Sequence, residues 1–374
     1  PGITDYIEDQ TTLAGLPDQG DPNAASWNVG GNDFGGQNSG GDFDRDNEGT
    51  LLNLRVDWDL QSMTLTSLSS YNDYQRTEAN GWDGVATRNW DQFNDTEIEV
   101  WSQELRLTSA TDGPLSWITG LYYAYDEVNE VSSGSGQLAT SQLYVTPETL
   151  GVDVNGDGVI DIYDVQAAGL NFDVFSTQYK QESESIGVFA HTEYEISEAF
   201  TAKLGARYTD DERKIIDSCT YDVDGTLANF FTVAVFEGAV EYQQGDCVTL
   251  NPDTFESVPY NETISSDHLT GQLGLDWRPG DNHLVYGIIS TGYKSGGFGA
   301  PAAASWTSLE SYDEEEVTSY ELGIKSTLFE GALQANAAVY YYDYDDKQVS
   351  SFIIDPVFGA LTKIVNAPES TVQG

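Results

Sequence analysis

The stretch SIGVFAHTEYEISEAFTAKLGARYT, residues 185–209, contains two runs in which apolar and polar side chains alternate. The apolar positions that share one face of each run are Ile186, Val188, Ala190, Tyr194 and Ile196 in the first, and Phe200, Ala202, Leu204, Ala206 and Tyr208 in the second. Phe189 breaks the pattern, because it stands on the polar face with His191. A period of two, with only Ser197 and Glu198 between the runs, predicts two antiparallel strands joined by a tight turn.

The same hairpin pattern occurs four more times, which predicts ten strands in five hairpins. The other paired runs are 51–60 with 63–74, 99–109 with 115–125, 268–277 with 283–293, and 318–328 with 332–344. An eleventh strand is expected to begin near 361–374. In the run 284–293 either face could be the outward one, so its register stays open.

Short turns alternate strictly with long connections that are rich in Gly, Asp, Ser and Asn. The long connections are approximately 77–96, 130–180, 215–264, 295–316 and 347–360. Transmembrane barrels have short turns on one side, long loops on the other, and strands of about ten residues that alternate apolar-out and polar-in. We therefore predict an all-β fold, a transmembrane antiparallel β-barrel with short periplasmic turns and long extracellular loops. A soluble sandwich would have no reason to collect its long loops at one end, and a solenoid would show a fixed repeat.

Two sets of side chains fit the two faces of such a barrel. Aromatic residues near strand ends are expected to form interfacial belts; they are Trp58, Trp117, Tyr123, Tyr125, Tyr208, Trp277 and Tyr341. Polar residues that alternate with apolar neighbours are expected to face the lumen and to form ion pairs across strands or against a plug. They are Arg55, Asp57, Glu104, Arg106, Glu193, Glu195, Lys203, Arg207, Asp276, Glu321 and Lys325.

The 374 residues include 62 Asp and Glu against 15 Lys and Arg, which gives a formal net charge of −47. Such a surface argues against nucleic acid as a partner, because phosphates require a basic surface. It suits a protein in a salty or calcium-containing medium outside the cytoplasm. No stretch approaches the roughly 20 apolar residues of a membrane helix. The chain opens without a signal peptide and both ends look cut, so we expect it to be part of a longer polypeptide.

The two cysteines, Cys219 and Cys247, lie in one Gly- and Asp-rich region between strands. A disulfide that closes this loop fits an oxidising compartment, and two unpaired thiols are the alternative.

The segment DVNGDGVIDIYD, residues 153–164, has the spacing of a calcium-binding loop of the EF-hand type. The expected ligands are Asp153, Asn155, Asp157, the carbonyl of Val159, Asp161 and Asp164. Gly158 stands at the sharp turn, and Asp164 stands where EF-hands prefer Glu. With a short helix expected at about 162–169, the segment resembles a dockerin repeat, although only one copy is present. We interpret it as a structural calcium site within the loop 130–180; an acidic turn that matches by chance is the alternative.

Several segments resemble the barrel of TonB-dependent outer-membrane receptors. They are GYKSGGF (292–298), YELGIKS (320–326), IVNAPESTVQG (364–374), SQELRLTS (102–109), WITGLYY (117–123) and KLGARYTDDER (203–213). The resemblance implies a 22-stranded barrel, of which residues 1–374 form a part without the plug domain, the TonB box and the last strands. It also implies partners, namely the TonB complex of the inner membrane, outer-membrane lipid and an extracellular small-molecule ligand.

The resemblance implies an active transporter for a scarce large nutrient, most often siderophore-bound iron, in the outer membrane of a Gram-negative bacterium. Oligosaccharides and cobalamin are other substrate classes. Loop aromatics could form an external vestibule that stacks on the ligand, or they could pack the loops together; they are Trp82, Trp90, Tyr260 and Trp306. A passive porin-like channel and a calcium-stapled surface adhesion protein are the alternatives. An enzyme is not expected, since no nucleophile elbow, phosphate loop or metal-spaced histidine pair occurs.

Overall fold

The computed structural model describes residues 32–34, 37–39, 45–81, 91–110, 113–135, 151–154, 156, 158–160, 174–223, 225–299, 305–357 and 359–374. The longer strands are β3 (Arg45–Asp59), β4 (Met63–Gly81), β5 (Asp91–Ser109), β6 (Leu115–Ser135), β7 (Val174–Ser197), β8 (Phe200–Asp222), β11 (Tyr260–Gly280), β12 (His283–Lys294), β13 (Glu315–Leu328), β14 (Leu333–Asp355) and β15 (Gly359–Gln373). The short strands are β1 (Asn32–Phe34), β2 (Gln37–Ser39), β9 (Leu250–Asn251) and β10 (Glu256–Ser257). The helical elements are α4 (Thr226–Phe230), the π-helical η1 (Phe231–Val235), α5 (Trp306–Leu309) and the 3₁₀ turn η2 (Phe329–Gly331).

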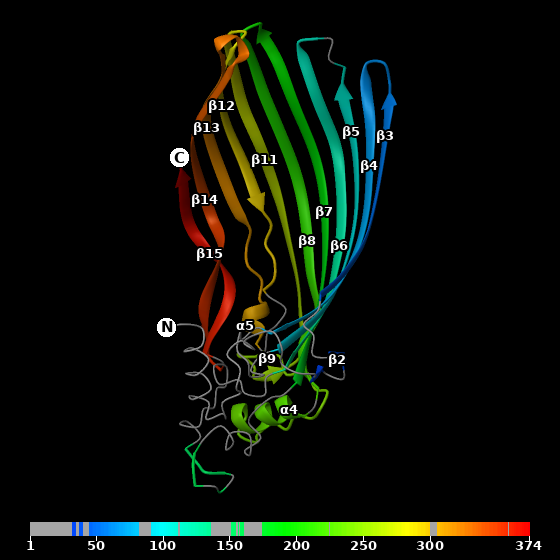
Figure 1. Ribbon diagram of the computed structural model, residues 1–374, viewed down its shortest axis with the longest axis vertical. Coiled ribbons are helices and arrows are strands. Elements are labelled where there is room, and N and C mark those ends of the chain that lie inside the picture. Colours follow the sequence, from blue (N-terminus) through cyan, green and yellow to red (C-terminus); the bar gives the residue numbers. More distant parts are fainter. Residues whose placement is uncertain are drawn as a thin grey trace.

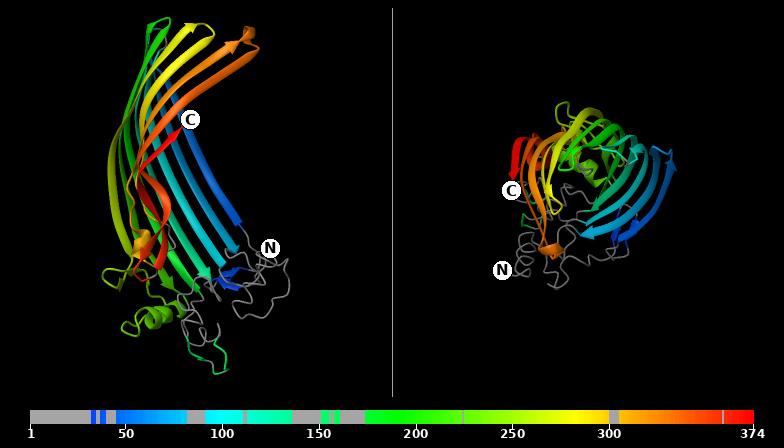
Figure 2. Two further views of the ribbon diagram at one scale, coloured as in Figure 1. Left: turned by 90° about the vertical axis from the view of Figure 1, so that its left-hand side faces the viewer. Right: turned by 90° about the horizontal axis from the view of Figure 1, so that it is seen from above.

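The eleven long strands form one antiparallel sheet in the order β15-β14-β13-β12-β11-β8-β7-β6-β5-β4-β3. Each long strand pairs with the next long strand along the chain, which confirms the predicted hairpins and the eleventh strand. The sheet curves into a trough that is open between β3 and β15 (Figure 2). The trough therefore has a convex outer face and a concave inner face.

Tight turns and long connections lie at opposite ends of the trough (Figure 1). The prediction of a long loop at 347–360 is wrong, because β14 continues to Asp355 and β15 starts at Gly359. The predicted strand length is also too short, since β7 spans 24 residues. Polar composition was the misleading signal: a strand beyond the bilayer is wet on both faces, so it continues without an apolar stripe.

The outer face carries an apolar band next to the tight turns. On β8, the exposed side chains of Phe200, Leu204 and Tyr208 point outward, and Asp210 and Glu212 follow on the same face. The eight residue steps from Phe200 to Tyr208 span about 26 Å at roughly 3.3 Å per step. At a strand tilt of about 35–45° this run rises roughly 20 Å, which is most of the apolar band of about 25 Å in outer-membrane barrels.

Pairing also settles the register of 284–293. Ile289 pairs with Leu273 on β11 and with Tyr320 on β13. All three side chains are exposed on the outer face. In the same band, the rings of Phe200 and Trp277 lie stacked, with their centroids 6.3 Å apart.

A compact cluster lies at the opposite end, and we call it the loop-end cap: residues 222–260, the β12–β13 connection, the β14–β15 turn, and the ends of β7 and β8 that hold Phe175 and Cys219. Its core is formed by Phe175, Leu227, Phe231, Val248 and Leu250. Cys219 and Cys247 are joined by a disulfide with Cα atoms 5.9 Å apart. The buried Asp222 carboxylate accepts hydrogen bonds from the backbone N–H groups of Leu227 and Ala228, which begins α4. No helix within the described ranges is long and apolar enough to cross a membrane.

Asp355 ties distant parts of the cap together. Its carboxylate accepts hydrogen bonds from Ser305 Oγ at 2.6 Å and Thr307 Oγ1 at 2.9 Å. Ser305 in turn forms a parallel bridge with Leu250 of β9. The end of β14 is thus connected, through α5, to the insertion that follows β8.

Candidate functional site

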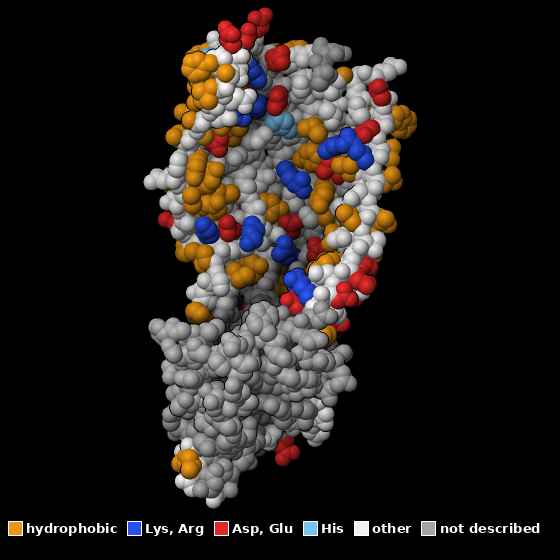
Figure 3. Space-filling view, viewed as in Figure 1, with side chains coloured by type: hydrophobic (Ala, Val, Ile, Leu, Met, Phe, Trp, Pro, Cys, Tyr) orange, Lys and Arg blue, Asp and Glu red, His pale blue; other side chains and the backbone are white. Residues whose placement is uncertain are grey.

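The concave face carries polar side chains, and Lys and Arg gather in its hollow (Figure 3). Lys203 Nζ of β8 lies 3.0 Å from the carboxylate of Asp276 on β11. Asp276 is 3% exposed, and Arg278 lies 3.7 Å from the same carboxylate. Lys203 also lies 3.8 Å from Glu193 of β7. These distances confirm the predicted cross-strand ion pairs for Glu193, Lys203 and Asp276.

Four other predicted lumen residues form ion pairs along one strand instead of across strands. Arg55 Nε lies 2.7 Å from Asp57, and Arg106 Nη1 lies 3.2 Å from Glu104. Residues two apart share a face of a strand, so a long arginine side chain can reach along its own strand. Among the residues that the structure describes, none of these four forms a cross-strand ion pair, although Thr66 Oγ1 of β4 donates a hydrogen bond to Asp57 at 2.7 Å.

The remaining predicted lumen residues include three that contact rings. Tyr286 Oη donates a hydrogen bond to Glu321 at 2.6 Å, and Lys325 Nζ lies 5.5 Å from the centre of the Tyr286 ring. Arg207 lies 5.3 Å from the centre of the Tyr122 ring. Glu195 is exposed near the tight turn between β7 and β8.

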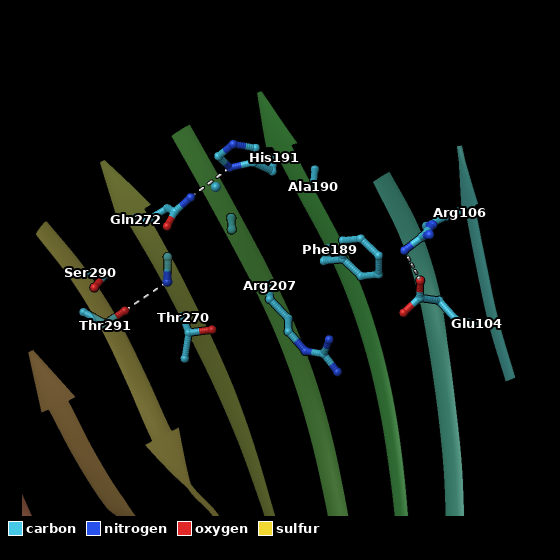
Figure 4. A pocket seen from close by; sticks show the side chains of 13 residues that line it. Glu104, Arg106, Phe189, Ala190, His191, Arg207, Thr270, Gln272, Ser290 and Thr291 are labelled. Carbon is cyan, nitrogen blue, oxygen red and sulfur yellow. Dashed lines mark hydrogen bonds and ion pairs between the residues drawn. The ribbon is translucent and has the colours of Figure 1, made fainter. Parts of the chain in front are cut away.

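A hollow of about 510 Å³ lies on the concave wall between β5 and β12. Its charged side chains are Glu104, Arg106 and Arg207, and Figure 4 shows them with the other residues that line it. Gln272 Nε2 lies 3.0 Å from His191 Nδ1, and His191 Nε2 lies 3.5 Å from Glu193. The hollow is therefore a polar surface with fixed side chains, suited to bind a polar solute.

Sequence reasoning placed Arg106 and Arg207 on this wall but missed the contribution of Gln272. Gln272 and His191 are 81 residues apart, and no local pattern relates them. The sequence did set Phe189 apart, because this apolar residue stands on the polar face of its strand. Its ring lines the hollow beside Arg207.

Tyr260 and Trp306, two of the expected vestibule residues, pack against each other in the cap. Their ring centroids lie 5.0 Å apart, and Trp306 Nε1 donates a hydrogen bond to the carbonyl of Val258 at 3.1 Å. Tyr260 is 5% exposed and donates a hydrogen bond to Glu262. Burial, and then this hydrogen bond, raise the pKa of Tyr260 above its usual value. Trp82 and Trp90 lie outside the described residues.

Part of the predicted calcium loop is described. The Asp153 carboxylate accepts hydrogen bonds from Gly156 N–H at 2.6 Å and from Gly158 N–H at 2.9 Å. Gly158 has a φ of +89°, which favours glycine at this turn position. Asn155, Asp157, Asp161, Asp164 and the expected helix at 162–169 lie outside the described residues.

An open, curved antiparallel sheet with an apolar outer band and a polar inner wall is the architecture of an outer-membrane β-barrel wall. Residues 2–374 match the family model described as TonB dependent receptor-like, beta-barrel, and the chain belongs to this family. Membership in this family places the chain in the Gram-negative outer membrane.

Solved structures share the fold at low sequence identity. The ferric yersiniabactin uptake receptor FyuA from Yersinia pestis is 15% identical, with a TM-score of 0.57; the match covers 86% of this chain and 40% of that one. The siderophore receptor PiuA from Acinetobacter baumannii is 16% identical, with a TM-score of 0.52 and coverages of 88% and 43%. The copper transporter OprC is 13% identical, with a TM-score of 0.52 and coverages of 89% and 43%. The chain thus spans less than half the length of these relatives.

Proposed function

We propose that the chain forms part of a receptor that takes up a metal chelate, namely siderophore-bound iron, with energy from the inner-membrane TonB complex. The observation that carries the proposal is the family match over residues 2–374, joined to a polar concave wall inside an apolar outer band. The likeness to FyuA, a ferric yersiniabactin uptake receptor, and to PiuA, a siderophore receptor, supports this substrate class.

Uptake of radiolabelled iron tests this proposal. Cells that carry the full-length protein should accumulate iron from chelates, and deletion of TonB should abolish that accumulation. Accumulation that does not depend on TonB, together with leakage of small solutes from liposomes, would instead identify a passive channel. Binding to cell surfaces without iron accumulation would identify an adhesion protein.

The external vestibule stays part of this proposal in a narrower form. Trp306, Trp82 and Trp90 are the candidates to contact a ligand. Tyr260 packs edge-on against the Trp306 ring and holds it in place. Substitution of Trp306 by Ala should weaken chelate binding, and Tyr260→Phe should leave it within about twofold, because the ring contact with Trp306 is retained.

Calcium binding at 153–164 is a second, structural proposal. The turn around Asp153 and Gly158 fits the first half of such a loop. The Asp153 carboxylate keeps further lone pairs that can bind an ion. Extracellular sites of this kind bind calcium at about 10⁻⁴–10⁻³ M. At about 1 mM calcium the ion then stabilises the folded loop by roughly 0.4–1.4 kcal/mol.

Limited proteolysis of the loop 130–180 measures this effect. Cleavage should accelerate roughly two- to tenfold when EDTA removes calcium, and Asp153→Asn should cleave fast in either condition. Equal cleavage of the wild type with and without calcium would show that the acidic turn matches the motif by chance.

A further inference from the structure

The hollow holds two arginines, and of these only Arg106 has a carboxylate partner among the described residues. Arg106 has Glu104, and Lys203 has Asp276 and Glu193. Arg207 forms no ion pair with any residue that the structure describes. Among the described residues, its one hydrogen bond runs from Nε to Thr209 Oγ1, at 2.9 Å.

Two aromatic rings and two glycines hold the Arg207 guanidinium in place. Its central carbon lies 5.3 Å from the centre of the Tyr122 ring and 6.0 Å from that of Phe189. A Cβ added to Gly187 would lie 2.6 Å from Arg207 Nη2, so the guanidinium rests directly on the β7 backbone.

A Cβ added to Gly120 would likewise lie 2.6 Å from Phe189 Cζ. Glycine weakens a strand interior and often marks a close approach of another group. Two glycines on neighbouring strands therefore make room for this ring and this cation.

The free donors of Arg207 define the chemistry of a ligand. A guanidinium has five N–H donors, and the one on Nε is used, so the Nη1 and Nη2 donors remain for a partner. A planar fork of donors matches a carboxylate, which it binds through two parallel charge-assisted hydrogen bonds. The flanking rings hold the fork against rotation, so less conformational entropy is lost on binding.

We propose that Arg207 anchors a carboxylate-binding subsite in the hollow of the concave wall. This inference deepens the proposed function and rests on it for the nature of the solute. The carboxylate belongs either to the carried chelate or to an acidic side chain of another segment of the intact receptor. Gly187 and Gly120 are positioning residues, since they act by seating Arg207 and Phe189.

Measurements of chelate binding by the intact receptor, purified from outer membranes, distinguish the two sources of the carboxylate. The probes are ferric citrate, which carries carboxylates, and ferrioxamine B, a trishydroxamate without one. The variants are Arg207→Gln, Arg207→Lys and, as a matched control on the same face, Arg55→Gln. Loss of one bidentate contact should weaken ferric citrate binding at least tenfold in Arg207→Gln. Arg207→Lys should recover only part of the affinity, and ferrioxamine binding should not change.

Structures of the intact receptor with and without ferric citrate complete the test. A protein carboxylate across both Nη atoms, seen without chelate, would support the subsite and assign it to an internal partner. The proposal is overturned if Arg207→Gln binds both chelates as Arg55→Gln does and no carboxylate meets Arg207 in either structure. Iron uptake is measured separately, so a receptor that fails to transport iron would count against the proposed function alone.

Discussion

The two ends of the trough are built from the same strands but for different solvents. Near the tight turns, large apolar side chains such as Leu204 and Leu273 are exposed on the outer face, and the inner face is polar. In the loop-end cap, apolar side chains such as Phe231 and Leu250 are buried together, with a disulfide beside them. The difference shows that the outer face near the tight turns contacts lipid. The cap, in contrast, lies in water and buries its own apolar core.

The largest expected effect is a loss of stability that is confined to the cap and leaves the membrane band intact. Phe231→Ala should destabilise the cap by about 3–5 kcal/mol, because Phe231 is fully buried and the cavity cannot collapse. Hydrogen exchange of the amides in 226–250 would measure it. Val339→Ala, on the exposed outer face, is the matched control and should cost less than about 1 kcal/mol, because lipid fills the space.

Removal of the disulfide is expected to have a similar but slightly smaller effect. Cys219 and Cys247 are 28 residues apart, and opening a loop of that length costs roughly 3–4 kcal/mol in the chain-entropy account. The double Cys→Ser variant should therefore be cleaved quickly within 222–260. If the sheet near the tight turns lost protection equally, the two ends would not be independent.

A third change compares exposed apolar side chains in the two solvents. Leu204 is 60% exposed in the band and Phe255 is 55% exposed in the cap. Leu204→Arg should destabilise the membrane-inserted protein by about 2–4 kcal/mol, since the charge would face hydrocarbon. Phe255→Arg should stay within about 0.5 kcal/mol, as for other surface changes in water. Unfolding in lipid vesicles measures both, and equal costs would refute the assignment of the band.

The smallest expected effect comes from removing the Asp355 carboxylate, which joins α5 to the end of β14 within the cap. Asp355→Ala leaves Ser305 Oγ, Thr307 Oγ1 and the Val357 N–H without their acceptor, at a cost of about 1–3 kcal/mol. Proteolysis should increase in the β12–β13 connection, where α5 lies. Unchanged cleavage there would mean that packing of Leu309 and Phe298 alone holds α5 in place.

Strands, turns and faces could be read from the sequence, because a period of two is a local property of the chain. Five hairpins, the eleventh strand and the polar wall followed from it, and they are present. Strand lengths could not be read in the same way, since polar residues beyond the bilayer do not end a strand. The partners of Arg55 and Arg106 depended on side-chain reach along a strand, which alternation does not specify.

The sequence by itself determined an alternating antiparallel sheet with its long loops at one end, because each strand carries its own two faces. Only the tertiary structure decided that Asp355 joins α5 to the end of β14, and that His191 meets Gln272. It also decided that Arg207 lies between two rings above Gly187, without a carboxylate partner among the described residues. The Asp355 and His191 contacts join segments that are far apart in the chain, so they arise only when the folded sheet brings the segments together. Arg207 and Phe189 are direct cross-strand neighbours in the β7–β8 hairpin, but the way their side chains pack is not specified by the alternation of the two strands.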